Sequence, residues 1–215
     1  MRFLVLSDIH GRAIVAKWAN RLAEENGVDA IIVLGDIVHF SPADWAEEFL
    51  SDLKYPVYAV PGNCDPPATM EYIKKKASLL HLSKVRLDGV TYIGFGGSNP
   101  TIFETPFEMD ESEIREKLEP LMEKDAIMVL HCPPRGKNDS IMGGKHVGST
   151  AIEGLVKAYR PRAVLSGHIH EDRGAFEEDG IFYMNPGAAK DGFAAVFEVG
   201  EKVQGGLLEK VTEQG

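Results

Sequence analysis

Seven side chains that can bind metal ions follow five separate apolar stretches of this 215-residue sequence. They are Asp8, His10, Asp36, Asn63, His131, His168 and His170. Imidazole nitrogens combined with carboxylate and amide oxygens suit Mn²⁺, iron, Zn²⁺, Ni²⁺ or Co²⁺ better than Ca²⁺ or Mg²⁺. Seven donors of these types are enough for two ions that share one carboxylate, so they indicate a dinuclear transition-metal centre.

The apolar stretches before these residues are expected to be buried strands that alternate with helices. The pattern predicts strands over 2–7, 29–36 and 56–63, and helices over 13–26, 42–53 and 67–77. Continuously apolar strands in a βαβαβ order are typical of a largely parallel sheet covered on both faces. Ligands of such a sheet bind beyond the carboxyl ends of its strands, where we expect the seven donors to meet.

Two pairs of donors each lie two positions apart in the sequence: Asp8 with His10, and His168 with His170. Residues i and i+2 of an extended chain point in the same direction. We therefore expect each pair to reach into one site from the end of one strand.

The second half of the chain continues the alternation and ends in hairpins. A strand–turn–strand unit is expected over 84–97, with its turn at Asp88–Gly89. An irregular stretch is expected over 99–110, followed by a charged helix over 111–122 and a buried strand over 126–134. A glycine-rich loop over 135–148, a helix over 149–159 and a strand over 162–167 complete this part. Hairpins are expected over 173–184 and over 193–199 with 203–211, and no linker divides residues 1–215, so we expect one domain.

The composition excludes several classes of function. The chain has 23 Lys and Arg against 33 Asp and Glu, a net charge of −10, which argues against a surface that coats nucleic acid or an anionic membrane. A phosphate-bearing substrate is still compatible, since a bound metal reverses the local charge. The sequence has only two cysteines and no signal-peptide pattern, which predicts a cytoplasmic protein. No apolar run approaches 18 residues, so no membrane-spanning helix is expected. Self-association is left open.

Five short motifs resemble, in order, those of the calcineurin-like metallophosphoesterases. They are SDIHG (7–11), LGDIVH (34–39), PGNCD (61–65), LHCPP (130–134) and SGHIHE (166–171). Any one motif is weak, but the ordered set covers about three-quarters of the chain. The resemblance implies a four-layer αββα sandwich, with two mixed β-sheets flanked by helices and the late hairpins in the second sheet.

The resemblance also implies a role for each donor. Asp8, His10 and His170 would hold the first ion, and Asn63, His131 and His168 the second, with Asp36 bridging them. The implied cofactors are two divalent ions, with manganese the first expectation and iron, zinc, nickel and cobalt the alternatives. The implied reaction is hydrolysis of a small phosphate ester by a metal-bridging hydroxide.

A phosphodiesterase is the expected activity. Two dications outweigh two carboxylates and one hydroxide, so the site stays cationic and suits a phosphodiester monoanion. A phosphomonoesterase or phosphatase is the alternative enzyme. A metal-retaining scaffold without catalysis is the alternative from another class of function.

Cys64 departs from a common form of the family, which has histidine at this position before an acid. That histidine is thought to protonate the leaving group, and a thiol is a poor proton donor near neutral pH. Asp65, the acid that orients it, is retained and is a catalytic candidate. The candidate replacements for the missing histidine are His39, three residues after Asp36, and His146 in the glycine-rich loop.

Four residues are candidates for contact with the substrate. Arg12 follows the first motif, and Asn63 and Cys64 lie in the third. Ser149 starts a predicted helix, where backbone N–H groups can bind an anion, although the same residue can simply cap the helix.

Overall fold

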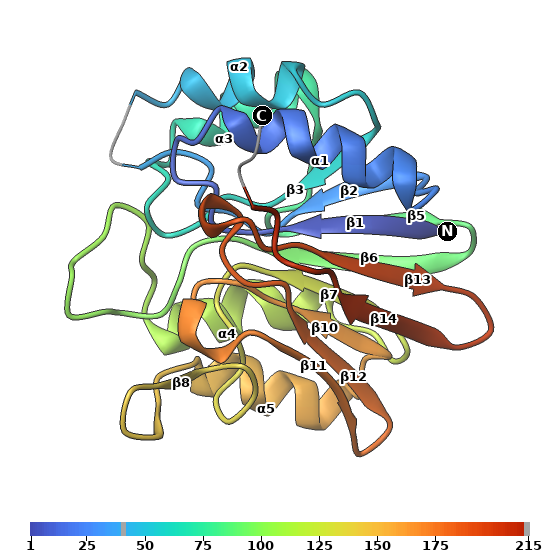
Figure 1. Cartoon of the computed structure of the whole chain (residues 1–215). Helices are drawn as coiled ribbons and strands as arrows, with labels where there is room; N and C mark the ends of the chain where they lie inside the picture. The colour runs from blue at the N-terminus through green and yellow to red at the C-terminus, as the bar shows by residue number, and fades with distance from the viewer. Residues whose placement is uncertain (40–41, 213–215) are drawn as a thin grey trace.

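Two six-stranded β-sheets lie face to face between two layers of helices (Figure 1). The computed structural model describes residues 1–39 and 42–212. This arrangement confirms the expected αββα sandwich of two mixed sheets.

The first sheet has the strand order β14-β13-β1-β2-β3-β4. Its strands are β1 (Arg2–Leu6), β2 (Ala30–Val33), β3 (Val57–Ala59), β4 (Ser78–Leu79), β13 (Ala195–Val199) and β14 (Val203–Leu207). Neighbours from β1 to β4 pair in parallel, whereas β13 and β14 are antiparallel. Helices α1 (Ile14–Glu25), α2 (Trp45–Ser51) and α3 (Thr69–Lys76) form the outer layer above this sheet (Figure 1).

The second sheet has the strand order β11-β12-β10-β7-β6-β5. Its strands are β5 (Ser83–Leu87), β6 (Val90–Phe95), β7 (Ile127–Leu130), β10 (Ala163–Leu165), β11 (Gly174–Glu178) and β12 (Ile181–Asn185). Helices α4 (Glu111–Leu118) and α5 (Thr150–Tyr159) cover its outer face (Figure 1). A short 3₁₀ turn, Glu119–Leu121, extends α4.

The central strands β1, β2, β7 and β10 are buried on both faces, and apart from the exposed Arg2 at the start of β1 all their residues are apolar. In β1, Phe3 and Val5 pack between the two sheets, whereas Leu4 and Leu6 pack against the outer helices. A third apolar cluster joins the second sheet to α4 and α5. The strand ends are therefore held firmly on both sides, which positions the polar residues that follow them.

Only one of the two late hairpins lies where it was expected. The hairpin β11–β12 belongs to the second sheet, but β13–β14 belongs to the first. β13 pairs antiparallel with β1, with Phe3 opposite Phe197, and so closes the free edge of the first strand. Burial of Phe197 between the sheets accompanies this pairing.

The glycine-rich stretch 135–148 differs from the loop without regular structure that its sequence predicts. It contains a small antiparallel hairpin of β8 (Ser140–Ile141) and β9 (Lys145–His146). Gly143 and Gly144 make its turn with φ of 89° and 73°, values that glycine adopts readily. No helix in the described part of the chain is both long and apolar enough to cross a membrane.

Candidate metal centre

The seven candidate donors come together at the carboxyl ends of five strands. Asp8 and His10 follow β1, Asp36 follows β2, Asn63 follows β3, His131 follows β7, and His168 and His170 follow β10. β1, β2 and β3 belong to the first sheet, and β7 and β10 to the second, so the site lies where the two sheets meet. This position agrees with the rule that ligands bind beyond the carboxyl ends of strands.

The donors are presented by tight turns rather than by extended backbone. The φ angles of Asp8, His10, Asp36 and His168 are 57°, 47°, 50° and 66°. The expectation that paired donors project from extended chain is therefore wrong. Backbone hydrogen bonds hold the turns together, from Asp8 N to Gly35 O at 3.0 Å and from His10 N to Asp36 O at 2.8 Å. Left-handed conformations of this kind are uncommon outside glycine and gather at functional sites.

Glycine is required where the ends of β2 and β3 meet. A Cβ atom on Gly62 would lie 2.0 Å from Asp36 Oδ1 and 2.2 Å from Asp36 N. No side chain fits between these atoms. The GD and GN motifs therefore need their glycines for close approach of the two turns, and the approach fixes the carboxylate of Asp36.

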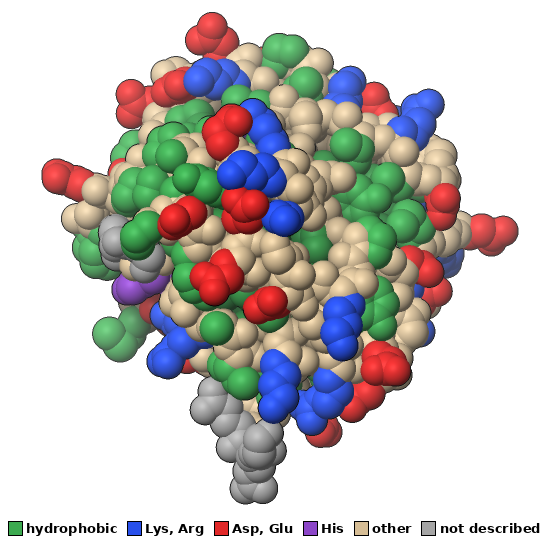
Figure 2. Space-filling view, turned by 90° about the horizontal axis from the view of Figure 1, so that it is seen from above, with side chains coloured by type: hydrophobic (Ala, Val, Ile, Leu, Met, Phe, Trp, Pro, Cys, Tyr) green, Lys and Arg blue, Asp and Glu red, His purple; other side chains and the backbone are tan. Residues whose placement is uncertain are grey.

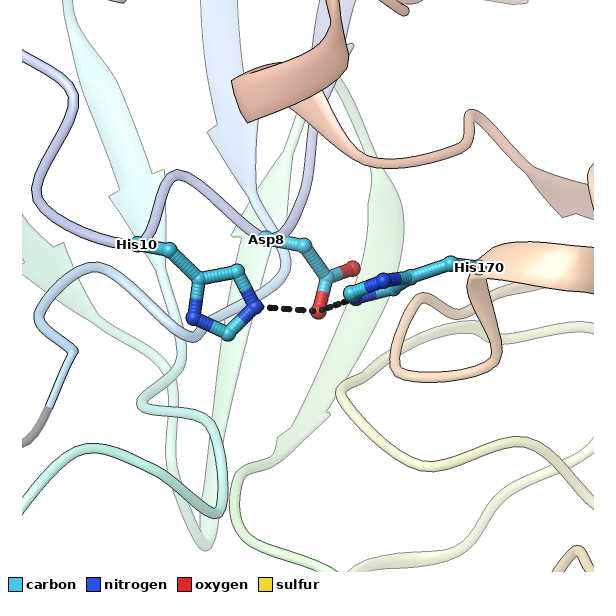
Figure 3. Close-up of side chains that lie close together, drawn as sticks. All are labelled: Asp8, His10 and His170. Carbon is cyan, nitrogen blue, oxygen red and sulfur yellow. Dashed lines mark ion pairs between the residues drawn. The ribbon is translucent and has the colours of Figure 1, made fainter.

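Asp8 lies between two histidines (Figure 3). Its Oδ1 atom is 3.1 Å from His170 Nε2 and 3.8 Å from His10 Nε2. Asp8 Oδ1 and His10 Nε2 are both buried and have no hydrogen-bond partner among the described residues. Unpaired buried polar atoms are costly, and a cation among them would satisfy both. Ligand atoms from Asp8, His10 and His170 all lie within 4.8 Å of one another.

His131 presents one ring nitrogen to oxygen atoms of two other candidate donors. Its Nδ1 is 2.7 Å from the carbonyl oxygen of Leu34, so Nδ1 carries a proton. Its Nε2 is 2.7 Å from Asn63 Oδ1 and 3.5 Å from Asp36 Oδ1. Lone pairs facing one another at this distance fit a shared cation. The His168 ring lies nearby, with its centroid 5.1 Å from that of His131.

Asp36 connects the two groups of donors. Its Oδ2 is 3.6 Å from His10 Nε2, and its Oδ1 is 3.5 Å from His131 Nε2. Oδ1 also accepts a hydrogen bond from the Cys64 N–H at 2.8 Å, which orients the carboxylate. The two oxygens of one side chain thus face two different histidines, one from each group.

Burial sets the charge of the donors. It lowers the pKa of His10 to about 4 despite the nearby carboxylates of Asp36 and Asp8. Burial, with the charge of His131, also lowers the pKa of His168 to about 4. Burial raises the pKa of Asp8, but the nearby imidazoles of His170 and His131 outweigh it and hold that pKa below its usual range. At neutral pH the imidazoles of His10 and His168 are therefore neutral and Asp8 is a carboxylate, the protonation states that bind metals.

A family model described as calcineurin-like phosphoesterase matches residues 1–172. The protein belongs to the calcineurin-like phosphoesterase family. Divalent metal ions are the cofactors that this family implies, and the donor set fits them.

Relatives of this phosphoesterase align with most of its length. An uncharacterised protein of Methanocaldococcus jannaschii, MJ1162, is 29% identical over 195 residues, which cover 86% of this chain and 88% of that protein. The structure of TT1561 from Thermus thermophilus has a TM-score of 0.76 at 20% identity, covering 95% of this chain and 97% of that one. A structure described as a novel archaeal phosphodiesterase has a TM-score of 0.58 at 18% identity, covering 97% and 100%.

Cys64 of the phosphoesterase borders the metal centre. Its Sγ lies within 4.8 Å of ligand atoms of both His10 and Asp36, and its side chain is buried. Burial and the charge of Asp36 raise the pKa of the thiol well above its usual range. The sulfur is thus close to the candidate metal ligands His10 and Asp36, but it is a weak proton donor.

The two candidate proton donors lie in different surroundings. His39 Nδ1 is 3.1 Å from Nδ1 of His10, so this ring contacts a candidate metal ligand. His146 lies on β9, where its Nδ1 is 2.6 Å from Asp139 Oδ1, and its side chain is about half exposed. The structure brings His39 to the seven-residue cluster and pairs His146 with a buried acid.

Asp65 faces backbone amides and is fully buried. Its Oδ1 accepts a hydrogen bond from Val38 N at 2.7 Å, and its Oδ2 accepts from Gly62 N at 2.7 Å and Ile37 N at 3.1 Å. Because these bonds join the turns after β2 and β3, the geometry favours a role in positioning Asp36 rather than direct contact with substrate.

Ser149 caps the N-terminus of α5, and the carboxylate of Glu111 occupies the position there that a bound anion would take. Its Oγ accepts from Ile152 N at 3.2 Å and donates to Glu111 Oε2 at 2.7 Å. The Glu111 carboxylate also accepts from the N–H groups of Thr150 and Ala151. The geometry thus favours capping over the predicted substrate contact. Arg12 is exposed in the turn before α1.

Sequence reasoning missed two residues that contact the donors from outside the motifs, one in an irregular segment and one in a 3₁₀ turn. Thr105 Oγ1 accepts a hydrogen bond from Asn63 Nδ2 at 2.9 Å. Lys190 N donates to the carbonyl oxygen of Asp8 at 3.1 Å. Neither residue belongs to a motif, and only the turn at Asn185–Gly187 before Lys190 offered a signal.

Proposed function

We propose that this phosphoesterase is a dinuclear phosphodiesterase that acts on small phosphate diesters. The observation that carries the proposal is the placement of Asp36, whose two oxygens face two different histidines, His10 and His131. One ion would be held by Asp8, His10 and His170, and the other by Asn63, His131 and His168, with Asp36 shared. Manganese is the first expectation, and iron, zinc, nickel and cobalt are the alternatives.

When bound, two divalent ions polarise the phosphoryl oxygens and supply a nucleophile from water at neutral pH. The chain itself provides a rigid, mostly buried frame. Only two of the seven donors, Asp8 and Asp36, are carboxylates, so the loaded site keeps a positive charge and attracts a phosphate anion.

The charge of the protein outside the proposed metal centre favours a small substrate over a nucleic-acid duplex. The net charge is −10. Figure 2 shows acidic and basic side chains interspersed over the face that carries α1, α2 and α3. Both cysteines are free, which supports a cytoplasmic location.

A comparison of two esters tests the substrate class. Chelator-stripped protein reloaded with Mn²⁺ is expected to hydrolyse bis-p-nitrophenyl phosphate faster than p-nitrophenyl phosphate. The reason is that the loaded site suits a diester monoanion, whereas the monoester carries one more negative charge and lacks the second ester group. Equal or faster cleavage of the monoester would indicate a phosphatase instead. Metal binding without turnover of either ester would indicate a non-catalytic scaffold. The presence of Cys64 in place of the usual histidine is the sequence feature that favours this alternative.

His146 is the proposed proton donor to the leaving group. Asp139 is fully buried and accepts hydrogen bonds from His146 Nδ1 and, at 2.9 Å, from Gly148 N, so it holds the ring in one orientation. Nε2 is then the nitrogen that can transfer a proton. His39 is the weaker candidate because its Nδ1 contacts the metal ligand His10.

Replacement of His146 by Gln is expected to affect esters according to their leaving groups. Hydrolysis of a diester with an alkyl leaving group should fall by about 10²-fold or more, because such an alkoxide needs a proton. Hydrolysis of bis-p-nitrophenyl phosphate should change little, because nitrophenolate leaves without one. Lys145→Gln, on the same short strand, is the matched control. Equal losses on both esters would remove His146 from this role.

A further inference from the structure

Asn63 poses a problem that the other six donors do not. Its amide has one oxygen with lone pairs and one NH₂ group without any, and rotation by a half-turn exchanges them. Only the orientation with Oδ1 toward His131 can bind a cation. The identity of the residue alone does not select that orientation.

Thr105 contacts the other end of the amide. Asn63 Nδ2 donates to Thr105 Oγ1 at 2.9 Å, and Thr105 Oγ1 in turn donates to Glu108 Oε1 at 2.6 Å. A hydroxyl has a single proton, so a hydroxyl that donates to a carboxylate can only accept from its other neighbour. The amide must therefore present Nδ2 to Thr105, which directs Oδ1 into the site.

Glu108 is held as an acceptor by several hydrogen bonds. Its Oε1 accepts from Thr105 N at 2.8 Å and from Thr101 Oγ1 at 2.6 Å, and its Oε2 accepts from Thr101 N at 3.1 Å. Burial raises the pKa of Glu108, but the hydrogen bonds from Thr101 and Thr105 outweigh it and lower that pKa below its usual value. The group is therefore a carboxylate at neutral pH.

The segment is also anchored to the backbone of the ligand. Phe107 N donates to the carbonyl oxygen of Asn63 at 3.0 Å, so the loop follows the turn after β3. The loop lies between β6 and α4, far along the sequence from Asn63. Its register relative to Asn63 is thus set by main-chain as well as side-chain contacts.

We propose that Glu108 and Thr105 form a positioning relay that selects the metal-binding orientation of the Asn63 amide. The proposal rests on the proposed dinuclear centre and concerns only the ion held by Asn63. A flipped amide would bring Oδ1 against the hydroxyl oxygen of Thr105, two acceptors without a proton between them. Neighbours that orient metal ligands in this way typically change metal affinity by about 10–100-fold when removed.

The test is metal binding rather than turnover. Mn²⁺ is titrated into chelator-stripped protein by calorimetry, with wild type compared with Thr105→Val, which keeps the shape and removes the hydroxyl. We expect one of the two binding events to weaken by about 10–100-fold and the other to stay unchanged. Thr105→Ser should restore wild-type binding because it restores the hydroxyl.

Thr101→Val is the matched control. It removes a second hydroxyl from the same carboxylate and leaves the contact with Asn63 in place, so both binding events should remain as in wild type. If it weakens binding as much as Thr105→Val does, general loosening of the loop replaces the relay as the explanation. Unchanged binding in Thr105→Val would also overturn the relay.

A double-mutant cycle with Asn63→Asp gives a second, independent readout. A carboxylate has two equivalent oxygens and needs no selection of orientation. The affinity lost through Thr105→Val should therefore disappear in the Asn63→Asp background, and persistence of the full loss would contradict the relay. Wild-type protein that binds a single ion would overturn the dinuclear centre and the relay together. Two bound ions without turnover would overturn the proposed activity alone.

Discussion

Replacement of Asp36 by Ala is expected to lower the rate of bis-p-nitrophenyl phosphate hydrolysis by about 10³-fold or more, with the fold retained. The two carboxylate oxygens of Asp36 face one histidine of each group, at 3.6 Å from His10 Nε2 and 3.5 Å from His131 Nε2. Its loss should therefore weaken both ion sites at once. Steady-state kinetics in excess Mn²⁺ measure the effect.

Two controls make the Asp36 result specific. Circular dichroism should show that Asp36→Ala keeps the native secondary structure. Removal of the buried carboxylate also removes the free-energy cost of taking its charge out of water. Glu177→Ala, at an exposed position on β11, should leave the rate unchanged. A rate for Asp36→Ala within tenfold of wild type would mean that hydrolysis does not depend on a shared carboxylate.

Replacement of Asp65 by Ala is expected to destabilise the protein by about 3 kcal/mol or more, because the change strips three buried backbone N–H groups of their acceptor and each such loss costs about 1–3 kcal/mol. The three groups are on Ile37, Val38 and Gly62. Urea denaturation of the metal-free protein measures the free energy of unfolding.

Asp65→Asn separates hydrogen bonding from shape at the same position. One of its two terminal atoms is an NH₂ group and must face a backbone N–H, so we expect a loss smaller than in Asp65→Ala but still measurable. Glu177→Ala should change the free energy of unfolding by less than about 0.5 kcal/mol. An Asp65→Ala protein as stable as this control would show that the buried carboxylate does not hold the two turns together.

The strand ends were the most predictable part of the molecule. Continuous apolar runs before Asp8, Asp36 and His131 predict strands buried on both faces, and parallel pairing brings such ends to one edge. Asp8 and His10 nevertheless do not converge by projecting from one extended strand, as their spacing predicts. Both have positive φ, because the chain turns sharply after β1 instead of continuing as a strand.

The predictions from sequence are wrong or incomplete where contacts between distant parts of the chain decide the structure. The hairpin β13–β14 has no local feature that distinguishes the two sheets, and its place is decided by pairing with β1. The N-terminus of α5 resembles an anion site in sequence, but Glu111 from a different helix supplies the anion. Thr105 and Glu108 lie in an irregular stretch without periodicity, so only the folded structure reveals their contact with Asn63.

A Mn²⁺ titration that records bound metal and turnover in the same samples tests the dinuclear centre most directly. Chelator-stripped protein has no activity to begin with if hydrolysis needs the ions. Hydrolysis of bis-p-nitrophenyl phosphate is expected to appear as the second equivalent of Mn²⁺ binds, with a final content of two ions per chain. Full activity at one ion per chain, or activity that survives complete removal of metal, would contradict the dinuclear centre.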